Sequence, residues 1–235
     1  MQHQSEMNDH PVQVRRDLFL ECISVVAFCC VQVIAWSKVT QSLSVSHWLV
    51  LAIVAGWLAA DLLSGCVHFL ADNFGTENTP ILGRAFISPF REHHVRPKQI
   101  LEHGFFERNG WNCGGAALLT VPVLIFDSKF NSHQGWQLFA IFTLTVSVFV
   151  SLTNQIHAWA HGAPAISFVQ LLQRAGIFLS PGNHDHHHEP FNRATRLNSS
   201  YTPTRSTTSF LSGHYCITSG IWNRLFGVIL RRKPS

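Results

Sequence analysis

The sequence predicts an all-α membrane protein that crosses the bilayer about four times. Three observations support this fold class: only 13% of the 235 residues are charged, 46% are hydrophobic, and the hydrophobic residues gather in long runs. Globular proteins carry about 25% charged residues, so this balance favours a membrane protein. The formal net charge of +4 is too small to indicate nucleic acid as a partner, and no zinc-finger spacing supports one.

Four apolar segments define the expected spans, at about 18–36, 47–70, 114–130 and 136–156. A helix needs about 20 apolar residues to cross the bilayer core, and the first, second and fourth segments supply them. The third is short and contains Pro122, so a buried core helix is the alternative there. We expect a polar N-terminal tail at 1–17, followed by a single membrane domain at 18–235.

The positive charges predict the topology. With four spans, every Lys and Arg except Lys38 and Lys129 falls on one face, which also carries both chain ends. Loops rich in Lys and Arg mark the cytosolic side, so we expect this face in the cytosol. A bacterial inner membrane and an endoplasmic reticulum both fit this topology.

The histidines follow the same division. If His3 and His10 of the N-terminal tail are set aside together with His47 and His133, the other eleven histidines all lie on this face or within a turn of it. A tag or a random surface patch does not recur in four separate segments on one side. We therefore expect a histidine-rich site on the cytosolic face.

The second span contributes one stripe of functional side chains. Asp61, Gly65, His68 and Asp72 follow one another at spacings of 4, 3 and 4 residues, which places them along one side of a helix. An ionisable group inside a span is energetically expensive and indicates function by default. The alternative is that Asp61 bonds to a neighbouring helix and that His68 reaches up to the interface.

Three further segments carry histidines at adjacent or helical spacing: His93 with His94, His157 with His161, and His184 with His187 and His188. Two imidazoles one helical turn apart can reach a single metal ion. In "HDHHHEP", Asp185 is placed to orient a ligand ring by accepting its free N–H, and His186 falls outside the H-x-x-H-H spacing. An adjacent pair such as His93 and His94, taken alone, is also typical of an ordinary surface.

Together the four segments supply eight nitrogen ligands, more than the four that a zinc ion takes. They suit two metal ions in a histidine-rich di-metal cap. Imidazole binds Fe, Zn, Cu and Ni, so ligand type alone leaves the metal open. Because apolar spans lie beneath the cap, a lipid chain is the expected substrate, and two irons with O₂ can remove hydrogen from its unactivated C–H bonds.

The order of the motifs resembles that of the Kua/CarF-type lipid desaturases. The matching stretches are "DLLSGCVHFLADNFG", "GRAFISPFREHHVRPKQILEHGFFERNG", "NQIHAWAH", "HDHHHEP" and "HYCITSGIWN", across about residues 55–227. The resemblance implies an O₂-dependent enzyme with two iron ions, supplied with electrons by cytochrome b5 or a ferredoxin-like carrier. It implies that the alkyl chain of plasmanylethanolamine, a membrane phospholipid, becomes the vinyl ether of a plasmalogen; a fatty-acyl desaturase acting on phospholipid acyl chains is the alternative.

The resemblance also implies the site residues. Metal ligands are expected at His68, His93, His94, His157, His161, His184, His187 and His188, with Asp72 and His103 in second rank. Asn183 stands where animal members have the first histidine of the last box, so no ligand is expected there. His214 is either a ligand or a neighbour of the "YCITSG" motif, and the Ser/Thr-rich insert at 190–212 is expected to be a polar loop.

Two other classes of function compete with an oxidoreductase. A non-enzymatic membrane metal-binding protein explains the histidines, but a transport path predicts polar residues that continue through the spans. The ionisable groups deep in the spans are limited to Glu21, Asp61 and His68. A zinc hydrolase needs fewer ligands and a nearby carboxylate; Glu92, Glu107 and Glu189 are the candidates.

Overall fold

The computed structural model describes residues 18–42, 46–80, 82–130, 133–188 and 214–231. The predicted polar tail at 1–17, Glu189 and the predicted loop at 190–212 lie outside the described residues. Throughout the described ranges the regular structure is helical. The all-α prediction is therefore confirmed.

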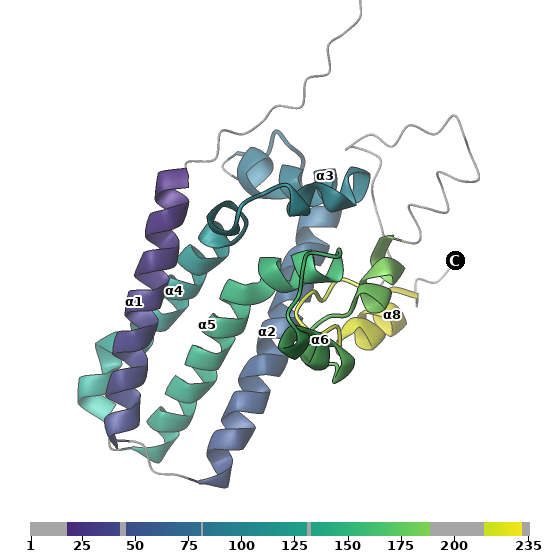
Figure 1. Cartoon of the computed structure of the whole chain (residues 1–235). Helices are drawn as coiled ribbons and strands as arrows, with labels where there is room; N and C mark the ends of the chain where they lie inside the picture. Colours follow the sequence, from purple (N-terminus) through teal and green to yellow (C-terminus); the bar gives the residue numbers. More distant parts are fainter. Residues whose placement is uncertain (1–17, 43–45, 81, 131–132, 189–213, 232–235) are drawn as a thin grey trace, which may run out of the picture.

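Four long helices form the body of the molecule (Figure 1): α1 (Leu18–Ser42), α2 (His47–Asn73), α4 (Phe105–Phe130) and α5 (Gln134–Ala160). Each is long and apolar enough to cross a membrane, which makes this an integral membrane protein. Every predicted span lies within one of them. α4 begins well before 114, where the third span was predicted to start. The prediction began too late because the first turns of α4 carry polar residues such as Arg108 and Asn112.

The bundle is ordered α1, α4, α5, α2, each helix packing on the next. Small and apolar side chains fill the contact between the first three, among them Ala35, Val123 and Leu144. A polar link crosses the same contact, since the Gln32 amide donates to Thr120 Oγ1 and to Ser147 Oγ, both at 2.9 Å. Such interhelical hydrogen bonds help to join helices inside a bilayer, where helix association has no hydrophobic driving force.

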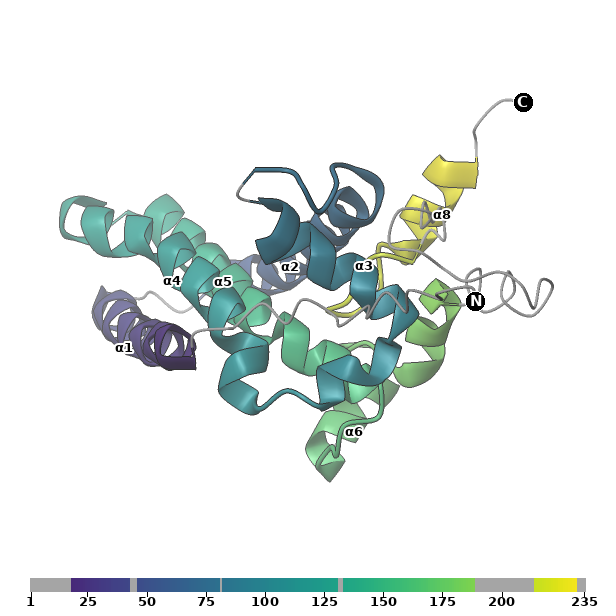
Figure 2. The ribbon, with the colours of Figure 1, turned by 90° about the horizontal axis from the view of Figure 1, so that it is seen from above.

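A cap of short helices covers one end of the bundle. Between α2 and α4 the chain forms a π-helical turn, η1 (Gly83–Ile87), then α3 (Ser88–Val95) and a 3₁₀ turn, η2 (Pro97–Leu101). After α5 follow α6 (Ser167–Arg174), a helical segment at 181–188, and α8 (Asn223–Arg231). Seen from above, α3 lies between α2 and the green segment that ends at 188 (Figure 2). Since α2 and α5 end and α4 begins here, the cap gathers segments distant in sequence.

The C-terminal segment is held against α2 by the carboxylate of Asp61. Its Oδ1 accepts hydrogen bonds from the backbone N–H groups of Ser219 (2.7 Å) and Gly220 (3.0 Å). One helical turn further on, a Cβ at Gly65 would collide with Cys216 Sγ, so only glycine lets this segment approach so closely. Asp61, an expected functional residue of the second span, thus fixes a loop.

Candidate metal centre

Eight buried or half-buried side chains form two groups of four in the cap. The α5-side group is His93, His161, His184 and His188, and the α2-side group is His68, Asp72, His94 and His187. In each group one potential ligand atom per residue lies within 4.8 Å of the others. A metal ion with four ligands fits each group by number and by chemistry.

Adjacent histidines are divided between the two groups. His93 and His94 on α3 go to different groups, and so do His187 and His188 on the segment 181–188. Successive side chains on a helix point about 100° apart, so a neighbouring pair reaches two different points. The adjacent spacing therefore has a geometric function, which is to tie the two groups together.

Nitrogens of the α5-side group and of the adjacent His157 converge on one another rather than on separate hydrogen-bond partners. His161 Nε2 lies 2.8 Å from His184 Nε2, and each of these atoms contacts His157 Nε2, at 3.2 and 2.9 Å. A neutral imidazole nitrogen carries either one proton or one lone pair, so three mutual contacts cannot all be hydrogen bonds. Imidazole nitrogens that lie this close together can instead be ligands of a shared metal ion, to which each binds at about 2.0–2.1 Å.

The same side chains are held in the neutral form that binds metals. Burial lowers the pKa of His93 and His184 well below the ordinary value, and neighbouring imidazoles lower it further. Burial and the nearby Lys98 lower the pKa of His161 to about 4. Burial lowers the pKa of His188 to about 2, with His94 contributing next. Neutral rings keep a lone pair for a metal ion.

The α2-side group converges on a carboxylate. Asp72 Oδ2 lies 3.0 Å from His94 Nε2, 3.4 Å from His68 Nε2 and 3.9 Å from His187 Nε2, and all four side chains are inaccessible to solvent. Asp72 Oδ1 and His68 Nε2 have no hydrogen bond within the described part of the chain. Buried polar atoms without partners are unfavourable, and a bound cation would satisfy them.

The C-terminal segment orients one ring of this group. His68 Nδ1 donates to the carbonyl oxygen of Tyr215 at 3.0 Å, so in the neutral ring Nε2 carries the lone pair and faces Asp72. Metal-bound histidines commonly donate their other N–H in this way, which fixes tautomer and ring orientation. Because Asp61 anchors the same segment, it holds the Tyr215 carbonyl indirectly.

His157 belongs to neither group of four but lies against the α5-side group. Its ring centroid is 4.4 Å from that of His93 and 4.6 Å from that of His184. All eight predicted histidines are therefore brought together. Asp72, expected in second rank, lies directly among them.

Several other predicted residues lie elsewhere. His103 Nδ1 lies 2.8 Å from Glu107 Oε1, and His103 is in neither group. Glu107 and Glu92, the described candidates for a hydrolase, are likewise outside both groups. The carboxylate that joins the histidines is instead Asp72.

The segment 181–188 follows the predicted H-x-x-H-H spacing. His184, His187 and His188 are buried, whereas Asp185 and His186 are exposed. The His186 ring lies tilted against the His214 ring, with ring centroids 5.5 Å apart. The structure thus places Asp185 and His214 outside the two groups.

The Tyr215 carbonyl and the anchoring role of Asp61 could not be found from the sequence. A backbone carbonyl has no residue-type signal, and His68 and Tyr215 are 147 positions apart. The only hint in the sequence is that the "HYCITSGIWN" motif, which contains Tyr215, is one of the stretches that resemble the lipid desaturases, although it lacks metal-ligand spacing.

Fold and site together define a helical membrane protein with a buried histidine cluster suited to metal ions at one end of its bundle. Comparison with known proteins narrows this class. A family model described as the lipid desaturase domain matches residues 57–229. The chain belongs to this family, and the predicted resemblance is confirmed.

Three relatives illustrate the similarity. Plasmanylethanolamine desaturase of Myxococcus xanthus is 35% identical over 208 residues, covering 87% of this chain and 66% of that protein. Plasmanylethanolamine desaturase 1 of Mus musculus is 38% identical over 184 residues, with 72% and 65% covered. The chloroplastic fatty acid desaturase 4-like 2 of Arabidopsis thaliana is 31% identical over 207 residues, with 86% and 64% covered. The chain thus spans just under two thirds of the length of these curated relatives, and no solved structure matches it.

Proposed function

We propose that this protein is an O₂-dependent di-iron lipid desaturase that forms the vinyl ether bond of plasmalogens from plasmanylethanolamine. One observation carries the proposal: two four-ligand groups meet at the end of a membrane bundle in a chain of the lipid desaturase family. The choice of an ether lipid follows two relatives, which are named plasmanylethanolamine desaturases.

The proposed ligands of the two iron ions are the eight histidines and Asp72. Nitrogen and carboxylate donors suit iron as well as zinc, and a donor set of this size exceeds the needs of one zinc ion. When bound, an iron pair supplies the ability to use O₂ for removing two hydrogen atoms from a saturated chain. With two electrons and two protons from outside, the products are one double bond and two water molecules.

The protein's own residues prepare this site. Burial favours the neutral form of His93 and His187, the Tyr215 carbonyl orients His68, and Asp72 contributes the negative charge of the α2-side group. His103, His214 and Asp185 lie outside both groups, and we propose that they support the surrounding structure. The apolar bundle beneath the cap keeps the reacting chain away from water.

We place the histidine-rich cap in the cytosol, because the loops on that side carry nearly all the Lys and Arg residues. The membrane is a bacterial inner membrane or an endoplasmic reticulum. An external carrier, cytochrome b5 or a ferredoxin-like protein, delivers electrons from the same side.

A fatty-acyl desaturase acting on phospholipid acyl chains is the second candidate. The Arabidopsis relative, named a fatty acid desaturase, favours it. The ligand groups serve either chemistry, since both reactions remove hydrogen from a hydrocarbon chain. The two candidates therefore differ in the lipid and not in the metal site.

Lipid analysis of cells with and without the gene tests the proposal, with an inactive His184→Ala variant as a matched control. We expect acid-labile vinyl ethers only with the wild-type gene. Altered acyl unsaturation without vinyl ethers would transfer the assignment to the acyl desaturase. Bound metal with no change in any lipid would support a non-enzymatic metal-binding protein.

A further inference from the structure

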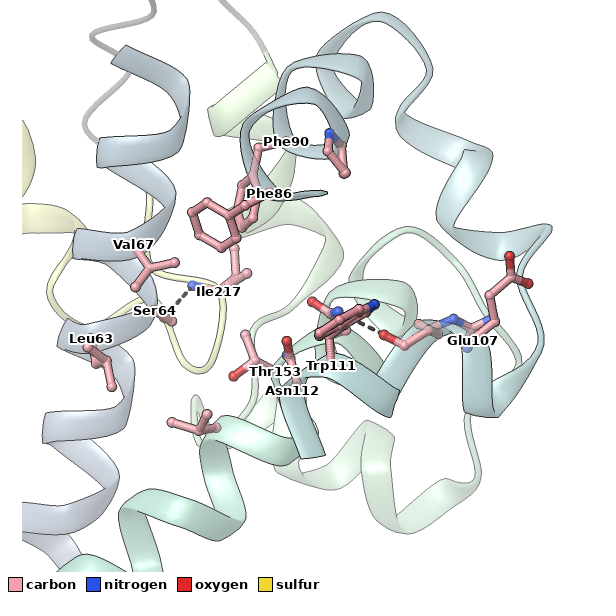
Figure 3. Close-up of a pocket in the computed structure, with 14 residues that line it drawn as sticks. Leu63, Ser64, Val67, Phe86, Phe90, Glu107, Trp111, Asn112, Thr153 and Ile217 are labelled. Atoms are coloured by element: carbon pink, nitrogen blue, oxygen red, sulfur yellow. Dashed lines mark hydrogen bonds between the residues drawn. The ribbon is translucent and has the colours of Figure 1, made fainter. Parts of the chain in front are cut away.

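A cavity lies between the membrane helices directly beside the α2-side group (Figure 3). Its volume is about 220 Å³, and it is enclosed by α2, α4 and α5 with the start of the cap as its roof. The lining is mainly apolar and includes Leu63, Val67, Phe86, Phe90 and Val150. Leu63 and Val67 project into it from α2 in the close-up view.

The inner wall of the cavity separates it from the ligand groups by a single layer of side chains. The ring centroids of Phe90 and His68 are 5.1 Å apart, and Phe86 packs on Phe90 at 5.0 Å. Ile217 lines the same wall and belongs to the segment that orients His68; its N–H donates to Ser64 Oγ at 3.2 Å. A molecule in this cavity thus lies next to the α2-side group.

The mouth of the cavity opens toward the bilayer. Leu63 on α2 is 40% exposed and Trp111 on α4 is 68% exposed, and both lie in helices apolar enough to span a membrane. α5 packs against both α2 and α4, and its residues Val150 and Thr153 form the back of the cavity. Exposed apolar side chains in such helices face lipid, so the opening is accessible sideways from the membrane.

We infer that this cavity binds the hydrocarbon chain of a membrane lipid, which enters sideways between α2 and α4 and lies one layer of side chains away from the α2-side group. The cavity is smaller than the usual ligand pocket of about 300–1,000 Å³. It therefore holds part of one chain, while the rest of the lipid stays in the bilayer. This inference rests on the proposed function, for which it provides the substrate site.

Photolabelling tests the binding directly and without turnover. The metal-loaded, full-length protein is placed in phosphatidylcholine vesicles containing a phospholipid whose ether-linked chain carries a diazirine, and labelled peptides are identified by mass spectrometry. We expect labels within 63–67 and 86–90 and at Val150. Labels confined to outward-facing positions such as Ile53 and Leu118 would overturn the inference.

Variants that fill the cavity separate this inference from the proposed function. Val150→Trp occupies its back and Leu63→Trp narrows its mouth, and Leu62→Trp adds the same bulk to a neighbouring lipid-facing position outside the lining. With unchanged metal content, we expect both cavity variants to reduce labelling and turnover at least 10-fold and Leu62→Trp to change neither. Reduced labelling in a protein that desaturates no lipid would refute the function but retain the site. Full labelling and turnover in both cavity variants would refute the site but retain the function.

Discussion

The two ligand groups differ in charge and in what supports them. The α5-side group is entirely imidazole and is built on α5, α3 and the segment 181–188, with His161 only half-buried. The α2-side group includes the carboxylate of Asp72, is completely buried, and depends on the Tyr215 carbonyl for the orientation of His68. The comparison shows that two donor sets can share α3 and the segment 181–188 and still differ in charge, burial and further support.

This difference predicts that the two groups can be disabled separately. α2 contributes ligands only to one group and α5 only to the other, while the paired histidines of α3 and 181–188 link them. The α2-side group also borders the cavity, whereas His161 of the α5-side group is accessible from outside the bundle. Mutations on the two sides should therefore have distinct consequences for metal content.

The largest effect is expected for His184→Ala. His184 Nε2 contacts the Nε2 atoms of His157, His161 and His188 at 2.9, 2.8 and 3.2 Å, so its loss removes the centre of the α5-side group. We expect product formation to fall by about 1,000-fold or more, together with loss of metal from that group. His186→Ala, on the exposed side of the same segment, is the control and should retain both. Equal losses in the two variants would mean that the segment, not the ligand, was disrupted.

A second large effect is expected for Asp72→Asn, which removes the negative charge from the α2-side group while keeping the side-chain size. Three histidines then remain near an amide, a poor metal ligand, and we expect about half of the bound metal to be lost. Asp185→Asn makes the same chemical change at an exposed position and should retain the metal. Metal content measured on both purified variants decides, and an unchanged content in Asp72→Asn would remove this residue from the ligand set.

A smaller effect is expected for Asp61→Asn, which acts at a distance. The amide keeps one oxygen for the N–H groups of Ser219 and Gly220, but it loses the negative charge and the second oxygen, which accepts from Trp222 N–H at 3.4 Å. The loop that positions His68 therefore loosens. Changes to groups that orient a metal ligand typically lower metal affinity by about 10–100-fold. Metal titration should show this weakening for one of two sites; weakening of both would contradict the separation of the groups. Ser64→Ala removes the acceptor for Ile217 N–H and the donor to the Asp61 carbonyl oxygen but leaves the Asp61 carboxylate in place, and it should lower stability by about 1 kcal/mol.

The smallest effect is expected in the membrane bundle, away from both groups. Gln32→Leu removes the hydrogen bonds to Thr120 and Ser147, and we expect a loss of about 1 kcal/mol of stability with normal metal content and activity. Thr40→Val is the matched control on α1, because the Thr40 hydroxyl bonds only within its own helix. A large loss of metal in Gln32→Leu would show that the bundle and the cap are not independent.

Much of the fold follows from local features of the sequence. Long apolar runs predicted the four membrane helices, and the spacing of His184, His187 and His188 predicted one buried face. The early start of α4 was not predictable from hydropathy, since Glu107 and Arg108 lower it although they lie in a continuous helix. Local patterns thus identified the elements, while polar residues obscured one boundary.

The division of the site into two groups required the tertiary structure. Spacing indicates that His93 and His94 diverge, but not that they meet His161 on one side and Asp72 on the other. The bond from His68 to Tyr215 spans 147 residues and depends on a loop held by Asp61. Contacts of this kind arise from the packing of segments that are distant in the sequence, and no periodic pattern of residues predicts them.

The number and identity of metal ions bound to the purified wild-type protein test the central claim most directly. After loading under reducing conditions with iron, elemental analysis should give about two iron ions per chain, one for each ligand group. A single zinc ion per chain that iron does not displace would contradict a di-iron site built from the α5-side and α2-side groups.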